Sequence, residues 1–377
     1  MNALPHLFAY VGPILLALGV VLGGVWTFLP VAFIFGLLPV LDDRVGRYDA
    51  NPPVASRGPR WTFDLALWLF VPVQTAAMVL VLARLTRGDA PASLVETIGL
   101  TLSLGVVSGS GGIVIAHELM HRASALSRAL AEILMTQASY AHFCIEHVHG
   151  HHRHVATPRD PASSRRGENV FAFVPRSIIG GALSAWRIES ERVARAGAAG
   201  TLRDRRLRMP LATALVYAGV VAFFGGKGAA LFLAQSAIAV ALLEVINYLE
   251  HYGLTRRELA PGRYERVGPE HSWNSSHRVS NLYLFNLARH SDHHYLASRP
   301  YEELRHWDDR EAPQLPTGYA AMLVVALVPP LWFRVMNPRV DAWTRTRPGV
   351  PVAADGTARS AMREEPRTVS EGIVADA

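Results

Sequence analysis

The residues best suited to chemistry in this chain are its 16 histidines, most of which stand in close groups. Within each group the spacing is often three or four residues, which places imidazoles on one face of a helix and lets two of them reach one metal ion. A single further histidine follows a long apolar stretch. The nine candidate metal ligands are His117, His121, His147, His151, His152, His251, His290, His293 and His294.

The kind of metal site is narrowed by the other residue counts. Neutral imidazole binds zinc, copper, iron and nickel, and one structural or catalytic zinc uses three or four protein ligands. Nine candidate ligands therefore favour two metal ions. The chain has one cysteine, Cys144, which excludes an internal disulfide framework, a zinc ribbon and an iron–sulfur cluster held by this chain alone.

Four acidic residues adjoin candidate ligands in the sequence: Glu118, Glu146, Glu250 and Asp292. A metal-bound histidine usually donates its outer N–H to a carboxylate or a carbonyl group. We therefore expect these four acids to orient the imidazoles. The alternative for each is an ordinary solvated or helix-capping carboxylate. The lone residues His6, His142 and His306 are expected to be ordinary core or surface histidines.

Two other classes of protein fit part of the pattern. His117 to His121 also matches H-E-x-x-H, in which Glu118 would be the general base of an intramembrane zinc protease. That interpretation leaves most of the clustered histidines without a role. A metal-ion transporter would place its ligands near the middle of the bilayer, whereas these groups follow the ends of apolar stretches.

The elements that must position the histidines are membrane-spanning helices. Half of the residues are hydrophobic and 18% are charged, against about 25% charged residues in soluble domains. The sequence predicts an all-α integral membrane protein with six transmembrane helices and a cytoplasmic, histidine-rich helical cap. Gly23-Gly24 is the expected hinge of the first helix pair. The expected spans, each close to the length that a bilayer needs, are 7–23, 26–41, 61–83, 94–116, 211–224 and 231–249.

The basic residues predict the orientation of these spans. Of the 37 lysines and arginines, 34 fall in the segments 42–60, 117–210 and 250–377, all on one side of the predicted membrane. Basic loops stay cytoplasmic, so both termini and the cap are expected there. The net charge of +6 then needs no nucleic-acid partner.

The apolar segments 130–145 and 319–336 complete the expected organisation. The first reads as a short buried or re-entrant helix and the second as interfacial. Residues 1–340 are expected to form one membrane-embedded domain, and residues 341–377 a disordered tail.

The chain resembles the membrane-bound alkane 1-monooxygenase family, which is related to integral-membrane desaturases and xylene monooxygenases. The histidine groups alone indicate the wider superfamily, and further strings indicate this branch. These strings are 43–53, 155–158 (VATP), 160–164 (DPASS), 247–254 (NYLEHYGL), 262–265 (GRYE), 271–275 (HSWNS), 289–294 (RHSDHH), 304–306 (LRH) and 313–319 (PQLPTGY). Val148 and Arg122 depart from the usual residues, and Val148 leaves one contact to a ligand in doubt.

The resemblance implies a di-iron centre held by the nine histidines, with no organic cofactor in the chain. It implies terminal hydroxylation of medium-chain n-alkanes with O2, electrons from rubredoxin and rubredoxin reductase, and a place in the bacterial inner membrane. A desaturase or a hydroxylase of aromatic methyl groups is the alternative. The roles of His149, His154, His271 and His277 stay open.

The alkane is expected to enter from the bilayer through an apolar tunnel between the first four spans. The small residues of 108–112 (SGSGG) could leave room for it near the metals. Close helix packing is an equal alternative for these residues.

Overall fold

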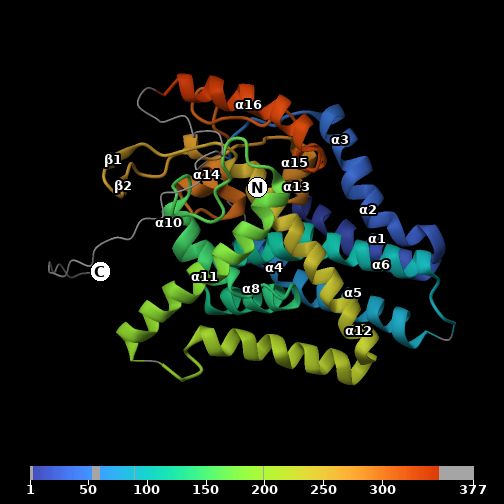
Figure 1. The fold of residues 1–377 in the computed structure, drawn as a ribbon. Helices are drawn as coiled ribbons and strands as arrows, with labels where there is room; N and C mark the ends of the chain where they lie inside the picture. Colours follow the sequence, from blue (N-terminus) through green and yellow to red (C-terminus); the bar gives the residue numbers. More distant parts are fainter. Residues whose placement is uncertain (1–2, 53–59, 89, 198, 348–377) are drawn as a thin grey trace.

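The computed structural model describes residues 3–52, 60–88, 90–197 and 199–347, and their regular secondary structure is almost entirely helical (Figure 1). Its β structure is one antiparallel hairpin, in which Glu258 pairs with Tyr264 and Ala260 with Arg263. The α-helices are α1 (Val11–Leu22), α2 (Leu29–Ala32), α3 (Leu38–Val45), α4 (Arg60–Trp68), α5 (Phe70–Arg87), α6 (Leu94–Val107), α7 (Val114–Met120), α8 (Ala125–Gln137), α9 (Phe143–Glu146), α10 (His152–His154), α11 (Val170–Ala196), α12 (Arg205–His251), α13 (Arg278–Tyr283), α14 (His290–Tyr295), α15 (Tyr319–Ala326) and α16 (Pro329–Arg345), and the strands are β1 (Glu258–Ala260) and β2 (Arg263–Tyr264).

Short helical turns of other types join several of these helices. The 3-10 turns are η1 (Leu4–Tyr10), η2 (Gly24–Phe28), η6 (Pro269–His271) and η7 (Tyr301–Glu303), and the π turns are η3 (Phe33–Leu37), η4 (Ser108–Ile113) and η5 (His147–His151).

Five continuous helical stretches are long and apolar enough to cross a membrane: Leu4–Leu22, Gly24–Val45, Trp61–Arg87, Leu94–Met120 and Arg205–His251. The last has 47 residues, which at 1.5 Å per residue is about 70 Å, more than twice the thickness of the hydrocarbon core. It bends at Gly225, whose φ of 68° and ψ of −174° lie outside the helical region. The chain therefore turns back on itself there (Figure 1), and its arms 205–224 and 226–251 complete an all-α multi-pass membrane protein.

Each predicted span falls within one of these helices or arms, except that 7–23 extends one residue beyond Leu22. The expected hinge at Gly23-Gly24 has φ values of 67° and 52°, which glycine adopts without the steric cost that other residues have. The arm containing 211–224 begins six residues earlier, at Arg205. The first residues of this arm include three arginines and Pro210, so the hydropathy pattern did not indicate that the helix begins there.

The remaining apolar segments do not form straight spans. Residues 130–145 divide between α8 and α9, which are separated by a turn with Ser139 at a φ of 56°. Helices α15 and α16 meet at an angle of 119°. Trp332, Met336 and Val340 of α16 pack against the end of α12. The described structure also contains the 27-residue helix α11. It lies in the segment 117–210, which was predicted only as a basic cytoplasmic connection between spans.

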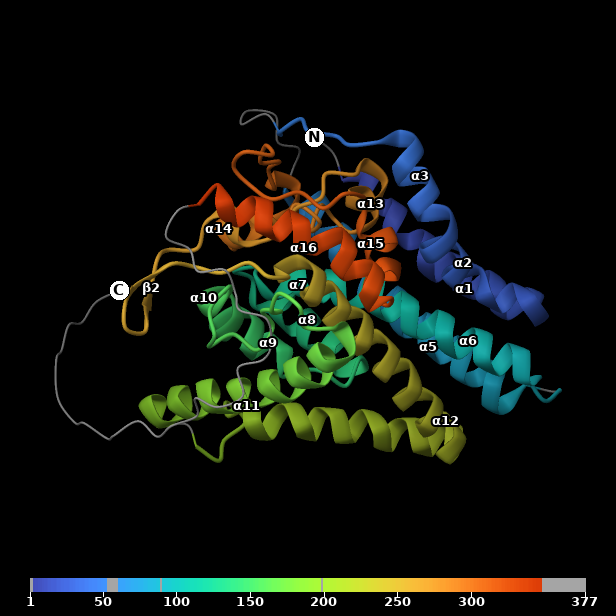
Figure 2. The same cartoon turned by 45° about the horizontal axis from the view of Figure 1, so that its top comes forward.

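The second half of the chain covers one end of the span bundle. Figure 2 shows α13, α14, α15 and α16 gathered there, with α1, α5 and α6 extending away from them. Helix α16 continues to Arg345, beyond the expected start of the tail, and Arg166 donates to Asp341 at 2.8 Å. Residues 348–377 of the expected tail lie outside the described residues.

Small residues allow close packing of the fourth span. A Cβ on Gly105 would come within 2.6 Å of Ile238 in α12, and one on Gly111 within 2.7 Å of Phe70 in α5. The backbones of these helices therefore approach each other through glycine, as expected at membrane-helix contacts. Gly109 also packs on α12, where a Cβ would lie 3.1 Å from Leu242.

Candidate metal centre

The nine candidate ligands meet in two adjacent groups at the covered end of the bundle. In each group, one possible ligand atom from every histidine lies within 4.8 Å of the others. We call them group one and group two. Group one contains His117, His121, His147, His152 and His293, and group two contains His151, His251, His290 and His294.

Two short helical segments contribute to both groups. The segment formed by η5 and α10 supplies His147 and His152 to group one and His151 to group two. Helix α14 likewise divides its histidines, with His293 in group one and two others in group two. Helix α7 and the end of α12 complete the two groups. The sites are therefore built on a shared framework.

The π turn η5 explains how His147 and His152 come together. Its hydrogen bonds join residues five apart, and the Nε2 atoms of these two histidines lie 3.0 Å from each other. His151 points instead toward group two, and its ring centroid lies 4.8 Å from those of His251 and His294. π turns are frequent at functional sites.

The geometry of the imidazoles fits metal ions. Nε2 of His293 lies 3.0 Å from Nε2 of His152, and Nε2 of His290 lies 3.4 Å from Nε2 of His251. Two ligands on metal–nitrogen bonds of about 2.1 Å at a right angle would be about 3.0 Å apart. Nε2 of His121, Nε2 of His151 and both ring nitrogens of His294 are buried without a hydrogen-bond partner among the described residues. A buried polar atom without a hydrogen-bond partner costs about 1–3 kcal/mol of folding free energy. A bound metal would supply the missing partner.

Burial keeps most of these imidazoles neutral. It lowers the pKa of His121 to about 3 and places the pKa values of His147, His152, His290, His293 and His294 well below the usual value, with neighbouring histidines adding to the effect. Neutral imidazole is the form that binds metals. These imidazoles are therefore ready to bind a cation at neutral pH without first losing protons.

Asp160 orients the imidazole of His151, a role that was not predicted from the sequence. Its Oδ2 lies 2.9 Å from Nδ1 of His151, and it also accepts from the hydroxyl of Ser163 at 2.6 Å. Burial disfavours both charged forms, but the pairing outweighs it, so that the pKa of His151 is raised and that of Asp160 is lowered. This is the carboxylate–histidine arrangement expected behind a metal ligand.

The four acids that the sequence singled out lie in different surroundings. Oε2 of Glu250 is 3.2 Å from Nε2 of His290, on the side that faces group two. Asp292 accepts from the Trp307 indole at 2.9 Å and the Arg305 backbone at 2.8 Å, and it pairs with Arg299. Asp292 thus holds the loop that follows α14.

Glu118 and Glu146 also face groups other than the clustered imidazoles. Glu118 accepts from Arg122 at 2.8 Å and from the backbone N–H of Tyr301 at 3.2 Å. Arg122 is itself buried and binds Glu302 at 3.0 Å. Glu146 borders a small polar cavity between α9, α11 and α12.

The other histidines lie outside the two groups. His271 accepts from the backbone N–H of Gly268 at 2.9 Å and lies 3.1 Å from Glu265. His277 contacts Ser275 and His306 contacts Ser276. His6 packs on the rings of Phe285 and Tyr301, and His149 and His154 are absent from both groups. Val148, the departure noted above, packs against the apolar core.

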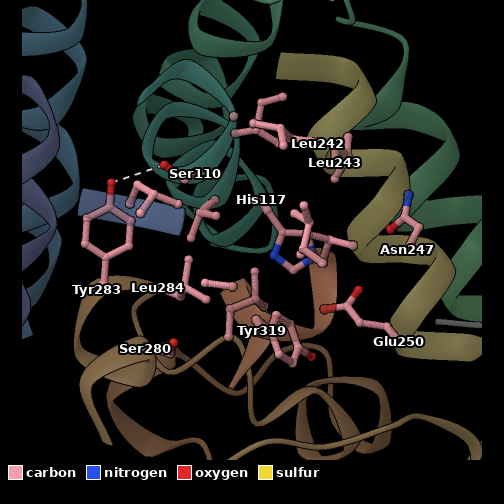
Figure 3. Close-up of a pocket in the computed structure, with 18 of the residues that line it drawn as sticks. Ser110, His117, Leu242, Leu243, Asn247, Glu250, Ser280, Tyr283, Leu284 and Tyr319 are labelled. Atoms are coloured by element: carbon pink, nitrogen blue, oxygen red, sulfur yellow. Dashed lines mark hydrogen bonds between the residues drawn. The ribbon is translucent and has the colours of Figure 1, made fainter. Parts of the chain in front are cut away.

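An apolar cavity of about 80 Å³ reaches the two groups (Figure 3). This volume is several times what one water molecule needs. His117 and His147 of group one and His290 of group two border it, with Glu250. Figure 3 shows Ser110 and Tyr283 at the far side from Glu250, joined by a hydrogen bond of 3.1 Å.

The cavity walls differ from the expected tunnel. They come from the second, fourth and last membrane arms and from α13 and α15, through residues such as Ile34, Ile113, Leu242, Leu284 and Leu323. The first and third spans do not line it. Gly109 and Ser110 of the small-residue string do line it, whereas Gly111 packs on Phe70, so the string both leaves room and packs helices.

Comparison with known proteins places this arrangement in a family. The fatty acid desaturase family model matches residues 92–326. Alkane 1-monooxygenase 2 of Pseudomonas aeruginosa is 44% identical over 84% of this chain and 85% of the relative. Alkane 1-monooxygenase of Pseudomonas putida is 42% identical over 85% of this chain and 79% of the relative. The xylene/toluene monooxygenase hydroxylase component XylM of Pseudomonas putida is 29% identical over 89% of each chain.

The range matched by the family model, 92–326, contains all nine clustered histidines. The chain belongs to the alkane 1-monooxygenase family, within the wider fatty acid desaturase family.

Proposed function

We propose that this protein hydroxylates the terminal carbon of medium-chain n-alkanes, using O2 and two iron ions held by the two histidine groups. The observation that carries the proposal is that an apolar cavity ends on histidines of both groups. Relatives at 40–44% identity are named alkane 1-monooxygenases, which supports the same substrate class.

The metal ligands follow from the two groups. His117, His121, His147, His152 and His293 would hold one iron, and His151, His251, His290 and His294 the other. Glu250 is a candidate oxygen donor to the second iron, because its carboxylate faces Nε2 of His290. When bound, the irons supply the redox chemistry that a strong C–H bond requires and that side chains cannot provide.

The chain itself positions the alkane and keeps its surroundings dry. Leu242, Leu243 and Leu284 give the cavity apolar walls (Figure 3), which bind a hydrocarbon through the hydrophobic effect and offer it no polar contact. Such walls orient a linear substrate only by shape. The end of the chain would therefore be presented to His117 and Glu250, where the cavity becomes polar.

Electrons must come from a separate protein, which we propose to be rubredoxin supplied by rubredoxin reductase. The chain has one cysteine, and burial raises the pKa of Cys144 to about 12, so it stays a thiol. The histidine-bearing end carries most of the arginines. A basic surface attracts an acidic carrier and speeds its encounter.

We further propose that residues 1–340 act as one domain in the bacterial inner membrane, with both termini and the cap in the cytoplasm. The arginine-rich segments 42–60, 117–210 and 250–377 support this orientation through the positive-inside rule. The histidine groups then face the compartment that holds soluble electron carriers.

The geometry disfavours the other functions. A protease of the H-E-x-x-H type needs Glu118 free to act as a base, but its carboxylate is paired with Arg122. A transporter would need its ligands near mid-bilayer, and these lie where α7 and α12 end. The similarity to XylM keeps aromatic methyl groups as a second substrate class to be tested.

The test is product analysis with the purified protein, iron, rubredoxin and rubredoxin reductase. Octane, hexadecane and m-xylene are supplied separately, and products are identified by gas chromatography with mass spectrometry. We expect 1-octanol as the main product of octane and little conversion of m-xylene. The absence of any 1-alkanol from both alkanes, or preferred oxidation of m-xylene, would overturn the proposal.

A further inference from the structure

The proposed reaction has a requirement that its apolar cavity does not meet. Hydroxylation follows RH + O2 + 2 H⁺ + 2 e⁻ → ROH + H2O, so that two protons must arrive and one water must leave in each cycle. The walls named above are mostly hydrocarbon, with few polar side chains such as Asn247 and Glu250 among them, and a dry cavity of this kind does not conduct protons because it holds no continuous chain of hydrogen-bonding groups. This inference rests on the proposed function and concerns how that reaction is supplied.

A second, polar cavity lies directly behind the first. It is bounded by Glu146, Ser177, Gly181 and Glu244 from α9, α11 and α12 and by Tyr140 from the turn before α9, and its volume is about 10 Å³. That is about the space one water molecule needs. Asn247 and Phe143 line both cavities, so the two cavities adjoin at these side chains.

The polar groups of this second cavity are arranged for hydrogen bonding to water. The Tyr140 hydroxyl donates to Glu244 at 2.8 Å, and the Asn247 amide donates to the other oxygen of Glu244 at 3.3 Å. Glu146, which is 3% exposed, also lines this cavity. A buried space of about one water molecule, bordered by hydrogen-bonding side chains, fits a bound water.

The second cavity continues outward through His142. This residue borders the polar cavity and also an outer groove of about 540 Å³ between α11 and the first arm of α12. Its ring lies 4.4 Å from that of Tyr140, and its Nε2 is shielded from solvent without a partner. Arg205 and Arg206, the charged start of α12, form one end of the groove, which places that end in reach of water.

We propose that His142, Tyr140 and Glu244 form a hydrated route that carries protons inward to Asn247 and the metal centre, and lets product water out, separately from the alkane cavity. The order is the outer groove, His142, the water beside Tyr140 and Glu244, and then Asn247. Glu146 also borders this route. No bond other than O–H and N–H bonds is made or broken along the route.

The protonation states of the outer groups suit this role. Burial lowers the pKa of His142 to about 4, so its neutral ring can accept a proton at one nitrogen while the other donates. Burial, with the nearby Glu244, raises the pKa of Tyr140 well above its usual value, so the hydroxyl keeps its proton and stays a donor. Both groups can therefore relay a proton without holding a lasting charge.

The first test detects the water itself, by X-ray hydroxyl-radical footprinting of the purified protein with mass spectrometry. Tyr140 and Tyr283 are both almost fully buried, at 4% and 1% exposed, but Tyr283 lines the apolar cavity. We expect Tyr140 to be oxidised several times faster than Tyr283, because radicals form at bound water. Equal protection of both residues would overturn the proposal.

The second test closes the route with a single methyl group. A Cβ on Gly181 would meet only Glu146, at 3.9 Å, so Gly181→Ala fits sterically while occupying the space of the water. We expect it to abolish the fast labelling of Tyr140 and to slow 1-octanol formation, with iron content unchanged. Gly219→Ala is the matched control, since nothing lies within 4 Å of its Cβ. Unchanged labelling and rate in Gly181→Ala would contradict the route.

The third test removes the proton-carrying group and keeps the size and shape of the side chain. Glu244→Gln should lower 1-octanol formation by up to about a hundredfold, at the low end of what a positioned proton donor contributes, with an increased solvent deuterium isotope effect. Glu132→Gln, which alters a carboxylate bound to Arg208, is the control. A wild-type rate in Glu244→Gln would refute its role, whereas inactivity of the wild type itself would refute only the proposed function.

Discussion

At the scale of single residues, the centre depends on imidazoles that are buried, neutral and mutually close. Nitrogen atoms of His147, His152 and His293 lie about as near to one another as ligands on one metal would. Such an arrangement is unfavourable by itself, because neighbouring buried nitrogens compete for few protons. A cation shared by them turns the same proximity into stabilisation, so these residues favour a metal-loaded state.

Replacement of a single ligand should remove metal from one group. We expect His251→Ala to lower bound iron toward half of the wild-type amount, because His251 belongs only to group two. His277→Ala is the control, since His277 contacts Ser275 and belongs to neither group. Plasma mass spectrometry measures the iron per chain. Equal iron contents in wild type and His251→Ala would exclude His251 as a ligand.

Loss of the Asp160 carboxylate, which contacts His151, should weaken metal binding by group two. Asp160→Asn leaves the ring of His151 without its charged partner at 2.9 Å, and changes of this kind typically cost about 10–100-fold in metal affinity. Competition with a chelator measures the affinity. Asp341→Asn, which alters a surface pair with Arg166, should behave as wild type. A chelator titration unchanged by Asp160→Asn would contradict the orienting role.

The sequence reveals the ligands more readily than their partners. Histidines three to five residues apart are predicted to share one face of a helix. The structure brings all nine of them together in two groups. Adjacent residues on a helix point about 100° apart, so an acid next to a ligand in sequence need not face it, as Glu118 and Asp292 demonstrate. Asp160 contacts His151 from nine residues away across an irregular loop, where no periodicity could indicate it.

At the scale of elements, π turns and glycines set the positions of the helices around the site. The turn η4 precedes His117 and η5 contains His147 and His151. An extra residue in a turn rotates the side chains that follow it, which directs successive histidines toward two different groups. Glycines then let the fourth span approach α12 closely enough for the cavity to reach these histidines.

The close approach of α6 to α12 makes a specific stability prediction. Gly105→Ala places a methyl group 2.6 Å from Ile238, whereas Gly112→Ala makes only ordinary contacts, 3.8 Å or more, with Gln74. Overpacking typically costs about 1–3 kcal/mol. We expect a clear fall in melting temperature for Gly105→Ala and little change for Gly112→Ala, measured by thermal unfolding in detergent. Equal melting temperatures would mean that the helices do not pack through Gly105.

Elements with strong apolar character could be predicted from the sequence, and mixed ones could not. The spans and the Gly23-Gly24 hinge follow from hydropathy and glycine chemistry. Helix α11 was missed because it combines Pro175, several arginines and scattered apolar residues. The cavity walls were also misplaced, since they depend on how α12, α13 and α15 pack in space, which sequence distance does not encode.

At the scale of the whole molecule, the buried histidines predict how stability depends on pH. The folded-state pKa values of His121 and His142 are lowered to about 3 and 4, while unfolded histidines titrate near 6.5. The unfolded chain therefore binds more protons below about pH 6.5, and the stability of the metal-free protein falls as pH decreases toward 4. Buried acids whose pKa is raised, such as Glu146 at about 8, act oppositely but are fewer than the histidines.

Thermal unfolding of the metal-free protein between pH 8 and pH 4 checks this dependence. We expect the melting temperature to decrease steadily below about pH 6.5 and the loss to be smaller when iron is bound, because the metal competes with protons for the same nitrogens. A melting temperature that is constant or rises on acidification would contradict the neutral, buried state of the histidine groups.

The most direct measurement of the central claim is the metal content of the intact purified chain. Two groups of five and four histidines predict two iron ions per chain after reconstitution under reducing conditions, determined by plasma mass spectrometry against protein from amino-acid analysis. A single metal ion per chain, or zinc retained in preference to iron, would contradict the account.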